Sequence, residues 1–193
     1  MSVQLYLASR SPRRAAFLAA LGLRHALIDG EVPEVPRPGQ LPQDYALETA
    51  VAKARAGAAN ARLDIPVLAA DTDVAIDGEI LGKPRDADDA VAMLMRLANR
   101  PHQVVSAVAV AHGARLETVV TTTEVLFGVI DERDARAYAD SGEPLDKAGA
   151  YGIQGHASRW VRAVHGSYTG IVGLPLYETA ELLGRFGVHT ARA

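Results

Sequence analysis

Residues 104–127, VVSAVAVAHGARLETVVTTTEVLF, set the architecture of this chain. β-branched residues dominate both halves of the stretch, and such residues favour strands. Gly113 lies between the halves, so we predict two long antiparallel strands, 104–111 and 116–127. Because antiparallel neighbours of this length are foreign to a purely parallel sheet, a doubly wound parallel fold is excluded.

The flanking sequence adds alternating helices and short strands. Asp77-Gly78 lies between residues 74–76 and 79–81 and predicts a hairpin, and a strand at 67–71 precedes it. The helix that starts near Asp86 should bury Val91, Leu94, Met95 and Ala98, and Asp131 should cap the next helix. The other predicted elements are strands at 5–8, 24–28 and 160–164 and helices at 12–21, 43–62, 131–139 and 175–186. The fold class is therefore α/β, with a mixed sheet flanked by helices.

Composition narrows the function classes. The chain has 193 residues, of which 49% are hydrophobic and 22% charged, as in ordinary globular proteins. It contains no cysteine, which excludes disulfides and thiolate zinc sites and suits a reducing cytoplasm. A net charge of −3 and 5% aromatic residues argue against a nucleic-acid surface. We expect no membrane span and no secretory signal.

Residues 9–14, Ser-Arg-Ser-Pro-Arg-Arg, join a strand to a helix. Free backbone N–H groups at a helix N-terminus bind anions, and arginines there add bidentate contacts to phosphate oxygens. The segment also suits a capped, solvated helix start, and alone it does not decide between the two.

Asp71 directly follows an apolar run, which places it at the carboxyl edge of the predicted sheet, where α/β proteins bind ligands. A carboxylate there can hold Mg²⁺ or accept a proton from water. A strand-terminating aspartate in a turn is an equally good interpretation. Lys83, between Gly82 and Pro84, is one residue out of place for a Walker A loop, so we reject that motif. The lysine can still contact a phosphate as a point charge, although the segment alone favours a surface turn.

Residues 142–155 form a loop rich in glycine and polar groups. Gln154 offers both a donor and an acceptor, as recognition of a nucleobase edge requires. The alternative is a structured Ω-like loop. Glu143 is either a member of the site or a turn residue.

Taken in order, these segments resemble the Maf family from about residue 4 to residue 186. The resemblance rests on residues 7–14, Glu34, Lys53-Ala54, residues 70–72, 82–84, 142–155, 166–168 and 172–175. Residues 71–72 and 146–155 are similar to the branch that hydrolyses dTTP and UTP, rather than the 7-methyl-GTP branch.

The resemblance implies a nucleoside triphosphate pyrophosphatase: a single domain over residues 1–193, with an elongated mixed sheet, two lobes and a central cleft, like inosine triphosphatases. It further implies a cytoplasmic homodimer that requires Mg²⁺ or Mn²⁺. The positions carried over are the catalytic Asp71, Glu34 and Lys83, the specificity residues Arg13, Thr72 and Gln154, and Ser9, Arg14 and Lys53 near the phosphates, with Glu34 and Asp71 as metal ligands.

Three positions depart from the family pattern: Glu48, Asp73 and Thr169-Gly170. Asp73 places a second carboxylate beside Asp71, which would bind another metal or raise a neighbouring pKa. Two rival functions remain. One is a nucleotide-sensing regulator of septum formation without turnover. The other is a nucleic-acid binder using Arg10, Arg13 and Arg14, which the acidic net charge disfavours.

Overall fold

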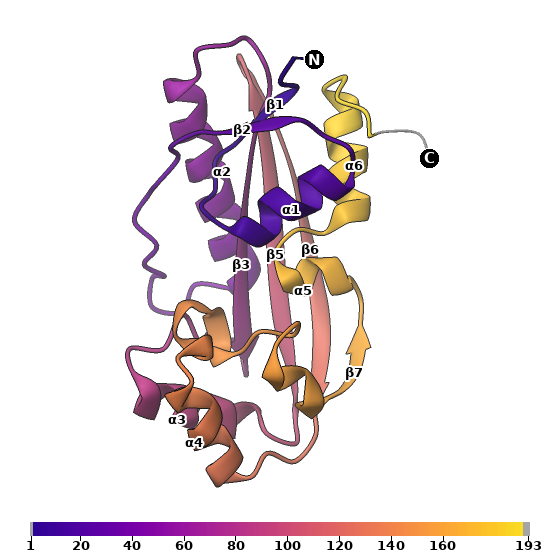
Figure 1. The fold of residues 1–193 in the computed structure, drawn as a ribbon. Coiled ribbons are helices and arrows are strands. Elements are labelled where there is room, and N and C mark those ends of the chain that lie inside the picture. Colours follow the sequence, from indigo (N-terminus) through magenta and orange to yellow (C-terminus); the bar gives the residue numbers. More distant parts are fainter. Residues whose placement is uncertain (1, 191–193) are drawn as a thin grey trace.

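The computed structural model describes residues 2–190, which form one elongated mixed sheet with helices around it (Figure 1). The strands are β1 (Leu5–Leu7), β2 (His25–Leu27), β3 (Val67–Ile76), β4 (Glu79–Ile80), β5 (Pro101–His112), β6 (Arg115–Phe127) and β7 (Val161–His165). The helices are α1 (Pro12–Ala20), α2 (Pro42–Asn60), α3 (Ala87–Leu97), α4 (Glu132–Asp140), α5 (Tyr168–Val172) and α6 (Leu176–Arg185). The 3₁₀ turns are η1 (Glu143–Asp146), η2 (Ala148–Ala150) and η3 (His156–Trp160).

The sheet has the order β2-β1-β3-β5-β6-β7, and β4 pairs with β3. β1 runs parallel to β2 and β3, whereas the β3–β5, β5–β6 and β6–β7 pairs are antiparallel. The predicted hairpin of β5 and β6 is confirmed, with Gly113 in the left-handed region at φ 56°. The mixed α/β class is therefore confirmed as well. Within the described residues, no helix is long and apolar enough to span a membrane.

β3 corrects one interpretation of the sequence. The strand does not end at Asp71 but continues through Ile76, so that Asp71 pairs with Ala107 in the middle of the sheet. The prediction that Asp71 lies at the carboxyl edge of the sheet is wrong. The reason is that the long, β-branched β5 supplies a hydrogen-bonding partner from Val67 to Ala75, and this pairing outweighs the low strand propensity of aspartate.

Helix α2 packs closely on one face of the sheet. Its alanines at positions 46, 50 and 54 are fully buried against the small side chains of β3 and β5. Gly57 continues this face, and a Cβ on it would lie 2.9 Å from both Ala8 Cβ and Val67 Cγ1. Small residues at i, i+4 spacing thus bring the α2 backbone close to the sheet, which directs the neighbouring Lys53 toward β3.

The other face and the far end of the sheet complete the core. Leu18 of α1 and Leu182 and Leu183 of α6 pack with β1 and β3, while α3 and α4 cover the end with β4 and β7. In α3, Val91 and Leu94 are buried as predicted, but Met95 is 39% exposed and Leu97 takes its place in the core. The predicted Asp131 cap is confirmed, since its side chain accepts from the Arg133 N–H.

Candidate active site

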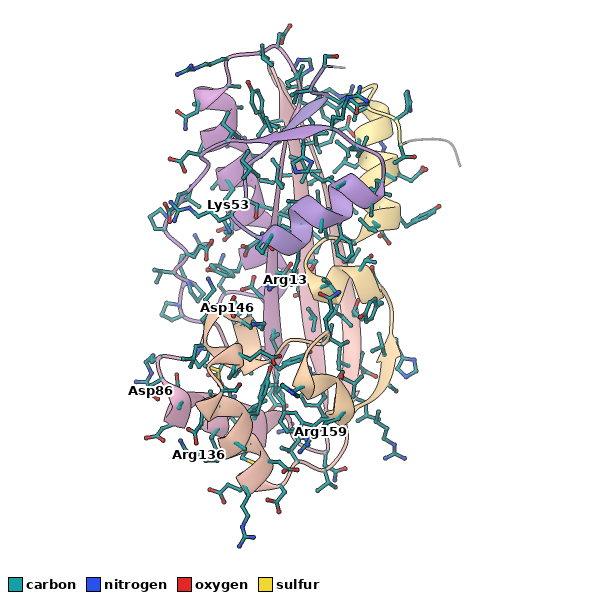
Figure 2. All side chains as sticks on the ribbon, viewed as in Figure 1. Arg13, Lys53, Asp86, Arg136, Asp146 and Arg159 are labelled. Atoms are coloured by element: carbon teal, nitrogen blue, oxygen red, sulfur yellow. The ribbon has the colours of Figure 1, made fainter. Side chains whose placement is uncertain are left out.

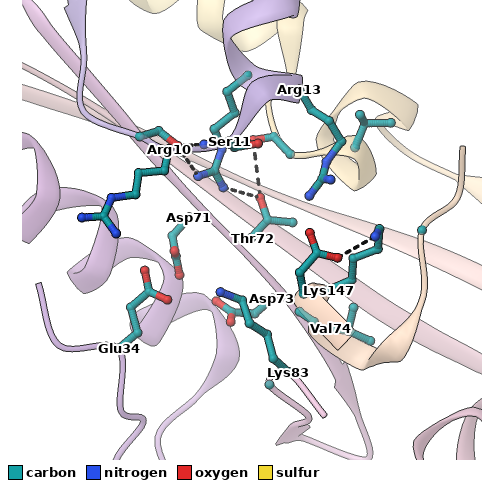
Figure 3. Close-up of a pocket in the computed structure, with 18 of the residues that line it drawn as sticks. Arg10, Ser11, Arg13, Glu34, Asp71, Thr72, Asp73, Val74, Lys83 and Lys147 are labelled. Atoms are coloured by element: carbon teal, nitrogen blue, oxygen red, sulfur yellow. Dashed lines mark hydrogen bonds and ion pairs between the residues drawn. The ribbon is translucent and has the colours of Figure 1, made fainter. Parts of the chain in front are cut away.

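The turn between β1 and α1 holds two arginines in different ways. Arg14 is fixed: its Nε donates to the Gly173 carbonyl (2.8 Å), Nη1 to Ser9 Oγ (3.0 Å) and Nη2 to Thr72 Oγ1 (3.2 Å). Burial lowers the pKa of Arg14, partly offset by the charge of Asp71, yet a guanidinium stays protonated at neutral pH. The Arg13 side chain makes no hydrogen bond with any residue from 2 to 190, and Figure 3 shows its guanidinium pointing into the cleft.

Lys53 of α2 lies between two carboxylates. Its Nζ donates to Asp71 Oδ1 (2.6 Å) and forms an ion pair with Glu34. Lys53 and Asp71 are buried, whereas the Glu34 side chain is 42% exposed on the loop before α2. Burial raises the pKa of Glu34, but the hydrogen bond and charge of Lys53 outweigh that effect and lower it. The structure thus brings together three of the predicted residues from three separate segments.

Asp73 adds a third carboxyl group on the same side of β3. It is 7% exposed, and its Oδ2 has no hydrogen-bond partner within the described chain. Burial raises the pKa of Asp73 to about 8, and the charge and hydrogen bond of Asp71 add to that rise. The predicted effect of this extra acid on a neighbouring pKa is found at Tyr45, where the charge of Asp73 adds to the effect of burial, and the pKa of Asp73 itself rises as well.

Thr72 faces the opposite side of the strand. Its hydroxyl lies 2.9 Å from Ser106 Oγ, which in turn donates to the Gly170 carbonyl (2.7 Å). Because successive side chains of a strand point to opposite faces, the acids Asp71 and Asp73 lie on one face of β3 and the Thr72 hydroxyl, which contacts Arg14, lies on the other. Figure 3 shows the acids turned toward Glu34 and Lys83, and Thr72 turned away from them.

The loop from residue 141 to 155 closes the other end of the cleft. Gln154 and Lys83 both line the cleft and have exposed side chains. The charge of Lys83 helps lower the pKa of Glu34. Lys147 Nζ donates to Asp146 Oδ1 (2.6 Å) and to the Glu143 carbonyl (2.5 Å). The Glu143 side chain accepts from Tyr138 Oη (3.0 Å), so Glu143 supports the loop.

Sequence reasoning missed Tyr45, Asp146 and Lys147 as residues that line the cleft. Tyr45 had a signal: with Thr49 and Lys53 it forms a line of buried polar residues at i, i+4, i+8 on α2. Burial and then the charge of Asp73 raise the pKa of Tyr45 to about 12. Glu48, which departs from the family pattern, forms bonds of 2.9 Å with Arg37 on the surface, away from the cleft residues.

The carboxyl groups of the cleft are of the chemical kind that binds a hard divalent cation. Within residues 2–190, no group of three or more histidine, aspartate or glutamate side chains forms a complete metal site. Mg²⁺, however, is usually held by one or two carboxylates together with phosphate oxygens and water. Glu34 and Asp71 supply such carboxylates, and the unpartnered, buried Asp73 Oδ2 is a further oxygen of the right kind beside them.

The nine predicted site residues all line one cleft of about 1260 Å³. Figure 2 shows three of its charged residues arriving from different elements: Arg13 from α1, Lys53 from α2 and Asp146 from η1. Four cations, Arg13, Arg14, Lys53 and Lys83, surround the carboxylates. Fold and site together define an α/β protein with a cleft suited to a ligand that carries several phosphates.

Comparison with known proteins gives the family. Residues 4–186 match the family described as Maf-like protein, and the chain belongs to it. A dTTP/UTP pyrophosphatase of Escherichia coli O157:H7 is 48% identical over 182 residues, covering 94% of this chain and 92% of the relative. A dTTP/UTP pyrophosphatase of Aromatoleum aromaticum is 44% identical over 200 residues, covering 97% of each chain.

A solved structure supports the fold. A HAM1 protein from Coxiella burnetii aligns with a TM-score of 0.55 and 16% sequence identity, covering 95% of this chain and 100% of that chain. At this identity the likeness concerns the fold alone.

Proposed function

We propose that this protein hydrolyses dTTP and UTP to the monophosphate and pyrophosphate. The observation that carries the proposal is the buried Lys53–Asp71 pair inside a cleft that Arg13, Arg14 and Lys83 also line. The names of the two relatives, each similar over nearly the whole chain, point to the same activity. Modified pyrimidine nucleotides are further candidate substrates.

The cations would hold the phosphate chain. Hydrolysis of a phosphoanhydride depends mainly on positioning and on neutralising charge. Arg14 is already fixed by three hydrogen bonds, so its guanidinium is preorganised, whereas Arg13 is free to follow the substrate. Ser9 sets the position of Arg14, and Lys53 and Lys83 add charge near the acids.

Asp71 would accept the proton of the attacking water. The water oxygen forms a bond to the α-phosphorus, the bond between that phosphorus and the bridging oxygen breaks, and pyrophosphate leaves. Asp71 suits this role because its carboxylate lies in the cleft and is held by Lys53 at 2.6 Å. A proton acceptor of this kind contributes ~10²–10⁴-fold to the rate.

Glu34 and Asp71 would hold Mg²⁺ or Mn²⁺, with Asp73 beside them. When bound, such a cation neutralises phosphate charge and lowers the pKa of coordinated water. Lys53 would then release Glu34, whose exposed loop position leaves it free to turn toward the phosphates. Gln154 is our candidate for base selection, together with Thr72 and Arg13.

We also propose that the protein acts in the cytoplasm, where its substrates are, and as a homodimer, which the resemblance to the family implies. Light scattering coupled to size-exclusion chromatography measures the second point directly, and a mass of one chain would contradict it. The names of the relatives favour the enzyme over a regulator that binds nucleotide without turnover.

The test is a product assay with Mg²⁺ and separate samples of dTTP, UTP, CTP, GTP, ATP and 7-methyl-GTP. We expect monophosphate and pyrophosphate, fastest from dTTP and UTP. Orthophosphate with diphosphate would show that a different bond is cleaved, and binding without turnover would support the regulator. Asp71→Asn should lower kcat ~10²–10⁴-fold with little change in KM. Asp64→Asn, at a 98% exposed side chain, is the matched control.

A further inference from the structure

The cleft has two chemically different ends. One end holds Arg14, Lys53, Lys83 and the catalytic acid Asp71, and there the phosphates would bind, while the charge of Arg13 also reaches Asp146. The other end is formed by η1, η2 and the segment around Gln154, with apolar residues such as Val74 and Ile153 beside them. If the phosphates bind among the cations, as the proposed function requires, the base of the nucleotide lies at this second end.

Gln154 alone cannot separate uracil from cytosine. Uracil and thymine present an N3–H donor next to the O4 acceptor, whereas cytosine presents an N3 acceptor next to an amino donor. Gln154 is exposed, and its amide has no hydrogen-bond partner among residues 2–190. Because a free amide can turn over and exchange its donor and acceptor, it pairs with either edge.

Asp146 and Lys147 are groups that cannot exchange roles. An ionised carboxylate only accepts hydrogen bonds, and an ammonium only donates them. Lys147 Nζ donates to Asp146 Oδ1 at 2.6 Å, and the Asp146 side chain is 71% exposed, so its second oxygen remains accessible to a ligand. The hydrogen bond from Lys147 lowers the pKa of Asp146, which keeps the carboxylate ionised at neutral pH.

The loop holds this pair in a fixed place. Lys147 Nζ also donates to the Glu143 carbonyl at 2.5 Å, which leaves a further N–H for a ligand. Gly152 packs against the Lys147 side chain, where a Cβ would come within 2.9 Å of Lys147 Cε. The Gly149 N–H donates to the Gly82 carbonyl at 2.7 Å and so ties the loop to the end of β4. Figure 3 shows Lys147 on the same cleft as Arg13 and Thr72.

We propose that Asp146 and Lys147 form a fixed acceptor and donor pair that recognises the N3–H and O4 edge of uracil and thymine and rejects cytosine. The inference rests on the proposed function and adds two specificity residues to it. Cytosine would place its N3 lone pair next to the Asp146 carboxylate, so that two acceptors meet, and its amino group next to the Lys147 ammonium, so that two donors meet. The 5-methyl group of thymine lies outside this edge, so dTTP and UTP are both accepted.

The experiment compares kcat/KM for UTP and CTP in the wild-type protein, Asp146→Asn and the control Asp140→Asn, an exposed acid on α4. An asparagine can present either its oxygen or its NH₂ group, so the UTP/CTP ratio should fall at least ~10-fold in Asp146→Asn, mostly through KM. The control should keep the wild-type ratio. An unchanged ratio in Asp146→Asn, with wild-type circular dichroism, would overturn the inference.

A chemical probe tests the same contact without mutation. 3-Methyluridine triphosphate lacks the N3–H, so the wild-type protein should hydrolyse it at least ~10-fold less efficiently than UTP. Equal efficiency would overturn the proposed contact to Asp146. Failure of the proposed function is distinguishable, because in that case the wild-type protein would hydrolyse neither UTP nor dTTP; hydrolysis of both with no effect of either perturbation refutes this inference alone.

Discussion

Lowering the pH should destabilise the protein through one buried histidine. His102 of β5 is 3% exposed, and its ring lies edge-on to Phe127 and Tyr151, with centroids 4.8 Å and 5.4 Å away. Its Nε2 lies 2.8 Å from Tyr151 Oη, on the loop that forms one end of the cleft. Burial lowers the pKa of His102 to about 4, against a smaller opposing effect of the Arg100 backbone.

The sign follows from proton binding. Because the folded-state pKa is below the unfolded value of about 6.5, the unfolded chain binds more protons between pH 6.5 and pH 4. Stability is therefore fully present above pH 6.5 and is lost as the pH falls toward 4. With these two pKa values, linkage gives a loss of about 2 kcal/mol between pH 7 and pH 5.

Urea unfolding at pH 7 and pH 5 measures this loss in the free energy of unfolding. The variant His102→Gln separates the contribution of His102 from that of the other titrating groups. Glutamine keeps a polar group near Tyr151 Oη but does not titrate, and the other titrating groups are common to both proteins. The stability of the wild-type protein relative to the variant should fall by about 2 kcal/mol at pH 5. If both proteins lose the same free energy of unfolding, the assignment of the pH effect to His102 is refuted.

Three further substitutions test the packing around the cleft. Lys53→Met leaves the buried Asp71 unpaired and should lower the free energy of unfolding by about 3–5 kcal/mol in urea; adding Asp71→Asn should restore most of it, and no restoration would count against the ion pair. Gly149→Ala should cost about 2–5 kcal/mol in thermal unfolding, since φ is 67° and the new Cβ would lie 2.7 Å from Val74 Cβ. Val74→Ala removes Cγ1 and Cγ2, which the new Cβ would meet at 2.7 Å and 2.9 Å, but keeps Val74 Cβ, so it should relieve only part of the steric loss, and full recovery would contradict the remaining steric and backbone contributions. Ser106→Ala removes one of the two donors to the Gly170 carbonyl, which keeps the Gly173 N–H, and should cost about 0.5–1.5 kcal/mol, with no change expected in the isosteric control Thr118→Val on β6.

The long strands and the motif residues were predictable because local sequence determines them. The β-branched residues of β5 and β6 around Gly113 identify the hairpin without any tertiary information. The position of Asp71 in mid-strand was not predictable, because it depends on the pairing of β3 with β5, a partner about 36 positions away along the chain. The burial of Leu97 in place of Met95 has a related reason. Which face of α3 is buried depends on the elements that pack against it at the end of the sheet, and not on the periodicity of its sequence alone.

The candidate site, like the fold, was predictable in part from the sequence. The sequence motifs identified Lys53, Asp71 and Glu34 individually, but their convergence depends on how closely the alanine face of α2 packs on the sheet. Asp146 and Lys147 carry no motif chemistry in isolation. The resemblance includes them in the segment 146–155, but the roles of their side chains appear only in the structure, where Lys147 Nζ bridges Asp146 and the Glu143 carbonyl on the wall of the cleft.

The alternation of Asp71, Thr72 and Asp73 on β3 also limits how this protein can change over evolutionary time. β3 and β5 are held in one register from Val67 paired with Ala111 to Ala75 paired with Gln103. A single-residue insertion or deletion within that span would move every later side chain to the opposite face and exchange acid for hydroxyl. Length variation should therefore be confined to segments outside the paired strands, such as the turns at Asp77-Gly78 and Gly113-Ala114, while β3 and β5 diverge by substitution alone.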